Sequence, residues 1–248
     1  MKKALLLLSV VTFSFTLSAQ LTAREIVQKS EDKLRGKSNK SELEIRIVRP
    51  TWQRTMVAKS WAKGTEKSMI LILSPARDKG TVFLKRDKEI WNYVPTVERN
   101  IKLPPSMMMQ SWMGTDFNND DLVRESSMVE DYTHKLLGES TIQGTACYKI
   151  EFTPKPEAPV VWGRLVCYIS KDEFLQLRVE FYDEDDVLIN VLEGFDVKEM
   201  DGRKLPSRMR MTPQDKEGHY TEMVYHSIAF NIAIDDAFFT TQNMKRVH

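Results

Sequence analysis

Residues 42–47 read Glu42-Leu43-Glu44-Ile45-Arg46-Ile47, a strict alternation of charged and aliphatic side chains. Alternation with this period is typical of a β-strand that turns one face to a core and the other to water. Similar segments, separated by turns rich in Gly, Pro and Asp, continue to residue 103 and resume from residue 132 to residue 231. We therefore expect a mainly β fold of the α+β class, with about ten or eleven strands in a single antiparallel sheet that is strongly curved or barrel-like.

Residues 22–34 have the spacing of a short amphipathic helix. Thr22 is a good N-cap, Glu25 completes a capping box, and Gly36 stands just past the predicted end. The apolar side chains of this helix are Ile26, Val27 and Leu34. We expect one N-terminal helix before the first strand.

The period changes again between residues 106 and 130. Segment 106–113 is apolar nearly all round, contains no β-branched residue and stops at Gly114, which favours a helix. Asn118 or Asn119 is then expected to cap a second short helix that runs through Glu125. The strands resume after this insert, and no linker divides the chain.

The first nineteen residues are typical of a cleavable signal peptide. Lys2 and Lys3 form a positive start, residues 4–11 are apolar, and Ala19 precedes the expected mature start. The alternative, a retained anchor, is disfavoured because the stretch falls short of the roughly 20 apolar residues that a membrane-spanning helix needs. We predict that residues 1–19 are a signal peptide and that residues 20–248 form a single exported domain.

The charge balance excludes a dedicated nucleic-acid binder. The chain has 36 Lys+Arg against 35 Asp+Glu, a formal net charge of +1, and so offers a polyanion no long-range attraction. Its 42% hydrophobic and 29% charged residues are typical of a folded globular protein.

The chain lacks the common catalytic motifs, namely a nucleophile elbow, a dinucleotide fingerprint, a phosphate-binding loop and a zinc-protease helix. Its four His have no metal-ligand spacing. Asp116-x-Asn118-x-Asp120 matches the start of a calcium loop, but Asp121 replaces the required Gly and Ser127 replaces the required Glu. Helix capping is therefore the favoured interpretation, and we expect no metal, no cofactor and no enzymatic activity.

Two cysteines, Cys147 and Cys167, lie in strand-like runs on either side of a Pro-rich loop. A hairpin centred on that loop would bring them near one another in an oxidising compartment. A disulfide and two buried free thiols are equal alternatives at this point.

Thirteen Met and five Trp are the notable counts. Many of them gather in the insert and in the strands just before it, where they would line an apolar cavity under a mobile lid or fill a plain core. The candidate lining residues are Trp52, Met56, Trp61, Met69, Phe83, Trp91, Tyr93, Met108, Met109, Trp112, Met113 and Phe117.

Several segments resemble a known family, the LolA-like outer-membrane lipoprotein-sorting proteins. The resemblance lies in Ser74-Pro75, Asp78-Lys79-Gly80-Thr81, Phe83-Leu84, residues 90–95, Ser111-Trp112-Met113-Gly114-Thr115-Asp116-Phe117-Asn118-Asn119-Asp120-Asp121-Leu122, residues 130–132, 202–206 and 234–240. The central block, residues 111–122, is the most specific part and is similar to the less-characterised branch of the family.

The resemblance implies a half-open β-barrel capped by an N-terminal helix and a helical lid insert, with an apolar cavity between them. It implies a periplasmic carrier chaperone, expected to be a monomer, that binds acyl chains of lipoproteins or other lipids. Such a carrier takes cargo from an inner-membrane transporter and gives it to an outer-membrane acceptor. In the best-studied member an early-strand Arg latches the lid, whereas the comparable stretch here, residues 61–64, offers Lys63.

Two other classes compete with the carrier. The same half-barrel can act as a lipid-binding sensor or as an accessory subunit of an inner-membrane transporter of hydrophobic compounds. An enzyme on this scaffold is the third class, and the missing motifs disfavour it. Carrier and sensor differ in whether cargo is released to an acceptor.

Overall fold

The structure, a computed structural model, describes residues 21–124 and 127–247. The predicted signal peptide, residues 1–19, and Glu125, the predicted end of the second helix, lie outside the described residues.

Thirteen strands form one antiparallel sheet in the order β6-β5-β4-β3-β2-β1-β13-β12-β11-β10-β9-β8-β7. The strands are β1 Ser38–Arg49, β2 Trp52–Lys63, β3 Lys67–Ser74, β4 Val82–Arg86, β5 Glu89–Val94, β6 Arg99–Lys102, β7 Tyr132–Ile142, β8 Thr145–Pro154, β9 Arg164–Ser170, β10 Gln176–Tyr182, β11 Leu188–Met200, β12 Arg203–Pro213 and β13 Tyr220–Phe230. β6 and β7 are the two edges and do not pair, so the sheet is unclosed. The predicted mainly β class and curved antiparallel sheet are confirmed. The sheet has thirteen strands rather than the expected ten or eleven, and even the five-residue β4 and the four-residue β6 pair as separate strands.

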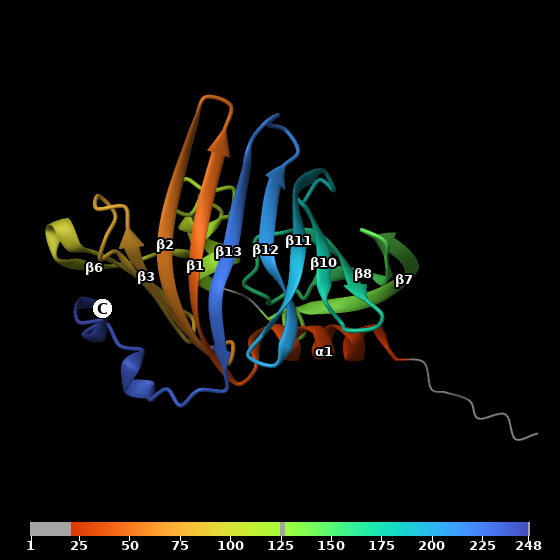
Figure 1. Ribbon diagram of the computed structural model, residues 1–248, viewed down its shortest axis with the longest axis horizontal. Helices are drawn as coiled ribbons and strands as arrows, with labels where there is room; N and C mark the ends of the chain where they lie inside the picture. Colours follow the sequence, from red (N-terminus) through yellow and green to blue (C-terminus); the bar gives the residue numbers. More distant parts are fainter. Residues whose placement is uncertain (1–20, 125–126, 248) are drawn as a thin grey trace, which may run out of the picture.

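The first strand, β1, joins the two halves of the sheet, β2 to β6 on one side and β7 to β13 on the other. β1 pairs with β2 on one side and with β13, the last strand, on the other. Figure 1 shows the strands fanned side by side, with the helix α1 lying across one end beneath β11, β10 and β8. The curvature gives the sheet a concave inner face and a convex outer face, and side chains alternate between the two.

Helix α1, Ala23–Arg35, is the predicted N-terminal helix, and its ends are as expected. The Thr22 side chain accepts a hydrogen bond from the Glu25 backbone N–H, and the Glu25 carboxylate accepts one from the Thr22 backbone N–H. Ile26 and Val27 are buried against the sheet. The local sequence therefore determined this element, since a capping box depends on residues three apart.

The insert between β6 and β7 does not form the predicted helix over residues 106–113. It contains the 3₁₀ turn η2, Pro105–Met107, an isolated bridge between Ser111 and Asn118, and the single-turn π-helix η3, Asp120–Arg124. Met113 has φ 50° and Gly114 has φ 79°, and these left-handed residues turn the chain back on itself where the helix was expected to stop. Asn118 caps η3 as predicted, because its Oδ1 accepts from the Asp121 backbone N–H at 2.8 Å.

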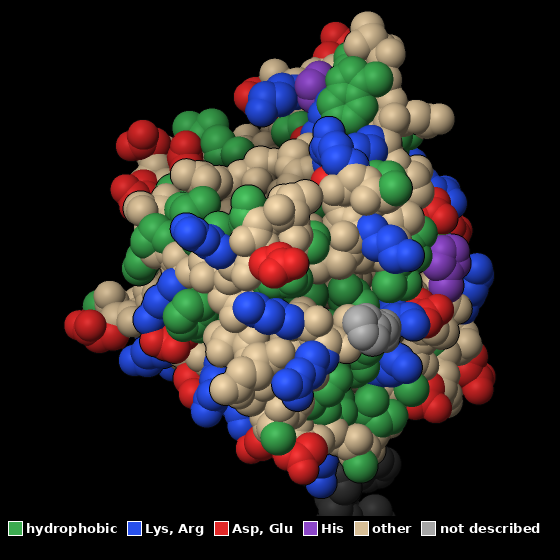
Figure 2. Space-filling model, turned by 90° about the vertical axis from the view of Figure 1, so that its left-hand side faces the viewer, with side chains coloured by type: hydrophobic (Ala, Val, Ile, Leu, Met, Phe, Trp, Pro, Cys, Tyr) green, Lys and Arg blue, Asp and Glu red, His purple; other side chains and the backbone are tan. Residues whose placement is uncertain are grey.

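The C-terminal segment, residues 234–247, covers the outer face of β2 to β5. It holds two 3₁₀ turns, η4 Asp236–Phe238 and η5 Asn243–Lys245, and a further turn, η1 Pro95–Val97, follows β5. Phe239 and Met244 are buried against Met69 and Leu84 of the sheet. Figure 2, the side on which β6 lies, shows hydrophobic side chains scattered among charged ones rather than gathered in a single patch.

Cys147 and Cys167 are both buried free thiols. Cys147 pairs with Ser170, and Cys167 pairs with Ile150, on the neighbouring strands β8 and β9. Their offset of three residues sends the two side chains to opposite faces of the sheet. Of the two alternatives, the structure therefore has the free thiols.

Replacing Phe239 by Ala tests the role of the C-terminal segment. Phe239 is 1% exposed, so we expect the free energy of unfolding to fall by about 3–5 kcal/mol in urea denaturation. Val97→Ala is the matched control, since Val97 is 56% exposed and its loss should cost no more than about 0.5 kcal/mol. Equal effects of the two changes would show that the segment does not stabilise the sheet.

Candidate functional site

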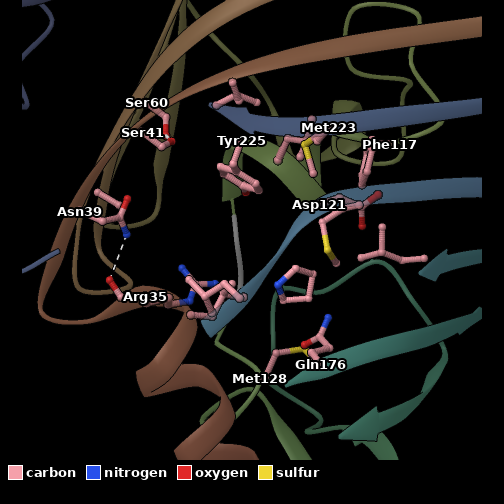
Figure 3. A pocket seen from close by; sticks show the side chains of 18 of the residues that line it. Arg35, Asn39, Ser41, Ser60, Phe117, Asp121, Met128, Gln176, Met223 and Tyr225 are labelled. Carbon is pink, nitrogen blue, oxygen red and sulfur yellow. Dashed lines mark hydrogen bonds between the residues drawn. The ribbon is translucent and has the colours of Figure 1, made fainter. Parts of the chain in front are cut away.

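A cavity of about 290 Å³ lies on the concave face of the sheet. It is bounded by α1, by the insert and by inner-face residues of β1 to β3 and β9 to β13. Figure 3 shows side chains from these elements converging on it, with Arg35 and Asn39 near α1 and Phe117 and Asp121 on the side of the insert. The cavity therefore has two recognisable ends.

Its walls are mainly aliphatic, aromatic and thioether side chains. Leu43 and Ile45 of β1 form one wall, and Leu165, Phe181 and Leu192 face them from β9 to β11. Five methionines also line the cavity: Met128, Met200, Met209, Met211 and Met223. Methionine is flexible and polarisable, so a wall of this kind adapts to apolar ligands of different shape.

Three of the twelve predicted lining residues, Trp61, Trp112 and Phe117, border the cavity. Trp112 and Phe117 come from the insert and are buried. Trp61 contacts the cavity at its edge, but its ring packs on Phe238 of the C-terminal segment, with centroids 5.2 Å apart.

The other nine predicted residues lie elsewhere. Met56, Phe83 and Met108 are buried in the core that supports the insert, and Met113 packs against that core. Met69, Trp91 and Tyr93 belong to the cluster under the C-terminal segment. Trp52 and Met109 are 51% and 66% exposed. The predicted lining residues therefore come from both faces of the sheet.

The sequence prediction missed the methionines of β12 and β13. Residues 208–211 read Arg-Met-Arg-Met, and this alternation marks Met209 and Met211 as one face of a strand. The arginines take the opposite face, where Arg208 and Arg210 pair with Glu222 at 2.9 and 2.8 Å. The alternation of Arg and Met in residues 208–211 is therefore the sequence feature that identifies these lining residues.

Two arginines hold the insert onto the sheet. Arg49, the last residue of β1, pairs with Asp116 at 2.9 Å and donates to the Gly114 carbonyl at 3.2 Å. Arg54 of β2 donates to the Met113 carbonyl. Lys63 lies in the stretch that corresponds to the latch Arg of the best-studied LolA-like member. It pairs with Asp236 of the C-terminal segment at 2.6 Å rather than with the insert. The insert is thus fastened by arginines at the opposite ends of these strands from Lys63.

The cations and Asn39 at the α1 end of the cavity are paired within the protein. Lys33 Nζ lies 2.6 Å from a Glu173 carboxylate oxygen, and Arg35 Nε lies 3.7 Å from Glu31. Asn39 donates to the Arg35 carbonyl at 3.0 Å (Figure 3). These ion pairs offset the positive charges at this end.

The insert end of the cavity holds a half-buried carboxyl group. Asp121 accepts hydrogen bonds from Trp162 Nε1 and from the Asn118 backbone N–H, both at 2.9 Å. Burial raises the pKa of Asp121 to about 7, with the nearby Asp120 adding to the shift. The carboxyl group therefore changes charge near neutral pH.

Within residues 21–124 and 127–247, no group of three or more His, Cys, Asp or Glu is arranged to hold a metal ion. In the same part of the chain, no helix has the length and hydropathy to cross a membrane.

The sequence from residue 64 to residue 246 matches the model of a family described only as "uncharacterized protein", and the chain belongs to that family. Among curated proteins, none matches the sequence.

Three solved structures share the fold over 90% of this chain. A DUF1329 family protein from Desulfovibrio piger is 25% identical, with a TM-score of 0.82 and 97% of its own chain covered. A putative outer membrane lipoprotein-sorting protein domain from Vibrio parahaemolyticus is 21% identical, with a TM-score of 0.80 and 98% covered. A LolA superfamily protein from Nitrosomonas europaea is 22% identical, with a TM-score of 0.79 and 100% covered. The resemblance to LolA-like proteins is thus confirmed, and the fold is theirs.

Replacing Asp121 by Asn tests the raised pKa of this carboxyl group. The pKa of Asp121 is raised in the folded state, so its contribution to stability is full below pH 4 and is lost as the pH rises through 7. The amide of the variant Asp121→Asn does not titrate, so the variant does not lose stability as the pH rises through 7. Relative to the wild type, we expect its free energy of unfolding to increase by about 2 kcal/mol from pH 5 to pH 8 in urea titrations.

Glu157→Gln, in an exposed loop, serves as the control and should follow the wild type at both pH values. A constant difference between Asp121→Asn and the wild type at pH 5 and pH 8 would contradict the raised pKa.

Proposed function

We propose that the mature protein is a periplasmic carrier that binds the acyl chain of a lipid or lipoprotein and moves it between the inner and outer membranes. The observation that carries this proposal is the cavity on the concave face, with five methionines and little uncompensated charge in its walls. The fold shared with a lipoprotein-sorting domain and a LolA superfamily protein adds support.

Burial of the acyl chain supplies the driving force for binding. Each CH₂ group removed from water contributes about 0.8 kcal/mol, so an apolar cavity can compete with a membrane for the chain. The cations that line the cavity, Lys33 and Arg35, are paired within the protein, so an apolar chain forms no ion pair that must be broken when the cargo returns to a membrane. The walls are thus suited to exchange rather than permanent retention.

The size of the cavity sets a limit on its cargo. Its volume of about 290 Å³ is just below the roughly 300–1,000 Å³ usual for small-molecule sites. In this closed form it fits one chain-like ligand. A lipoprotein with several acyl chains requires the insert to move outward, which breaks the hydrogen bonds of Arg49 and Arg54 to the insert backbone.

The proposed partners follow from this role. An inner-membrane transporter supplies the cargo, and an outer-membrane acceptor receives it. A lipid sensor would bind the same cargo but would not pass it on. Transfer of a fluorescent phospholipid from donor to acceptor vesicles, accelerated by the protein, distinguishes the carrier from the sensor.

Met209→Glu places a carboxylate in the wall of the cavity. Met209 is only partly buried and lines the cavity, so the fold should tolerate the change while the charge opposes an apolar ligand. We expect the affinity for N-phenyl-1-naphthylamine, an uncharged fluorescent probe, to fall at least about tenfold, with the far-UV circular dichroism unchanged.

Met209→Leu is the matched control and should retain the affinity to within about threefold, since it conserves volume and polarity. If the wild type binds neither this probe nor cellular lipid in native mass spectrometry, the carrier proposal fails.

A further inference from the structure

One buried donor in the cavity wall has no acceptor within the described residues. Trp112 lines the cavity and is 1% exposed, yet its indole Nε1–H makes no hydrogen bond to the described part of the protein. Trp162, the other tryptophan at this end, donates to Asp121 at 2.9 Å. Of these two indole groups, Trp162 therefore donates to an acceptor within the described part of the protein and Trp112 does not.

An unpaired buried N–H is a specific cost to the protein. Leaving such a group without a partner costs about 1–3 kcal/mol, and buried polar atoms are nearly always paired. A phenylalanine would pack on Phe83, whose ring centroid lies 5.3 Å from that of Trp112, without this cost. The indole is therefore suited to a partner that the chain itself does not supply.

The charges around the cavity define what this partner can be. Asp120 and Asp121 line the same end as Trp112, and Asp121 receives its hydrogen bonds from an indole and a backbone N–H. The cations Lys33 and Arg35 line the α1 end, where Glu173 and Glu31 offset them. An anionic group beside Trp112 would thus meet carboxylates rather than a free cation.

We propose that the cavity selects lipids that carry an uncharged hydrogen-bond acceptor, such as an ester carbonyl, which accepts from Trp112 Nε1. This inference rests on the proposed function, because it concerns the ligand of the same cavity. The apolar walls hold the hydrocarbon chain, and the indole N–H distinguishes an acyl ester from a plain alkane of similar length. The acidic groups at the same end discriminate against the ionised fatty acid.

Competition for N-phenyl-1-naphthylamine tests the selectivity in the wild type. Methyl palmitate, hexadecane and palmitate are compared at pH 8.5, where palmitate is ionised. We expect methyl palmitate to displace the probe at a roughly three- to tenfold lower concentration than hexadecane, the factor of one hydrogen bond of ordinary net strength. We also expect methyl palmitate to compete better than palmitate.

The variant Trp112→Phe removes the donor and keeps an aromatic ring. It should bind methyl palmitate about three- to tenfold more weakly and hexadecane with nearly the wild-type affinity. Phe117→Leu is the matched control, because it trims a lining ring of the same insert without removing a donor. It should weaken the ester and the alkane by the same factor.

The outcomes separate this inference from the proposed function. Probe binding with equal competition by hexadecane and methyl palmitate overturns the selectivity and leaves the carrier intact. Tighter binding of palmitate than of the ester also overturns it, and assigns recognition to the cations of the α1 end. Absence of any probe binding defeats the carrier proposal itself. The wild-type comparison decides the question even where Trp112→Phe does not fold.

Discussion

The apolar concave face of the sheet is the constraint on which the rest of the structure depends. A sheet of thirteen strands that curves without closing exposes one long inner surface, which its own strands cannot cover. Two separate segments cover it: α1 meets β1 near Asn39, and the insert meets the other end of β1 near Arg49. Because the two covers approach from opposite ends and do not fill the face, a cavity remains between them.

The two covers are attached by different kinds of interaction. Helix α1 is regular, has a capping box at its start and buries Ile26 and Val27. The insert has little regular structure, and it is fastened by buried side chains such as Trp112 and by hydrogen bonds from Arg49 and Arg54 to its backbone. Hydrogen bonds from charged donors to carbonyl groups are strong but few, so they can be broken and remade as a set. The insert is therefore held by side-chain contacts, whereas α1 is a regular helix.

The sequence predicted those features that depend on near neighbours. Alternation in residues 42–47 and the capping box at Thr22 are local, and both were correct. The helix predicted over residues 106–113 of the insert was wrong. The chain reverses at Met113 instead, and this reversal depends on left-handed backbone conformations and on contacts with distant strands. The cavity wall was only partly found because strand pairing decides which face a residue takes. Trp61 and Met69 pair directly and share the outer cluster, whereas Met209 and Met211 line the cavity from the far half of the chain.

Under the proposed function, selection of cargo and closure of the cavity would be coupled through the insert. The cations Lys33 and Arg35 at the α1 end are paired within the protein, and Ser41 and Ser60 hydrogen-bond to each other at 2.8 Å. Trp112 Nε1, a buried donor in the cavity wall with no acceptor among the described residues, belongs to the segment that Arg49 and Arg54 fasten. A ligand that accepts from this donor binds the closed form more tightly than the open form, and so stabilises closure by that difference in affinity. A chain without an acceptor fills the same walls but forms no hydrogen bond that stabilises closure. Under the proposed function, retention and release would therefore depend on the chemistry of the cargo as well as on its length.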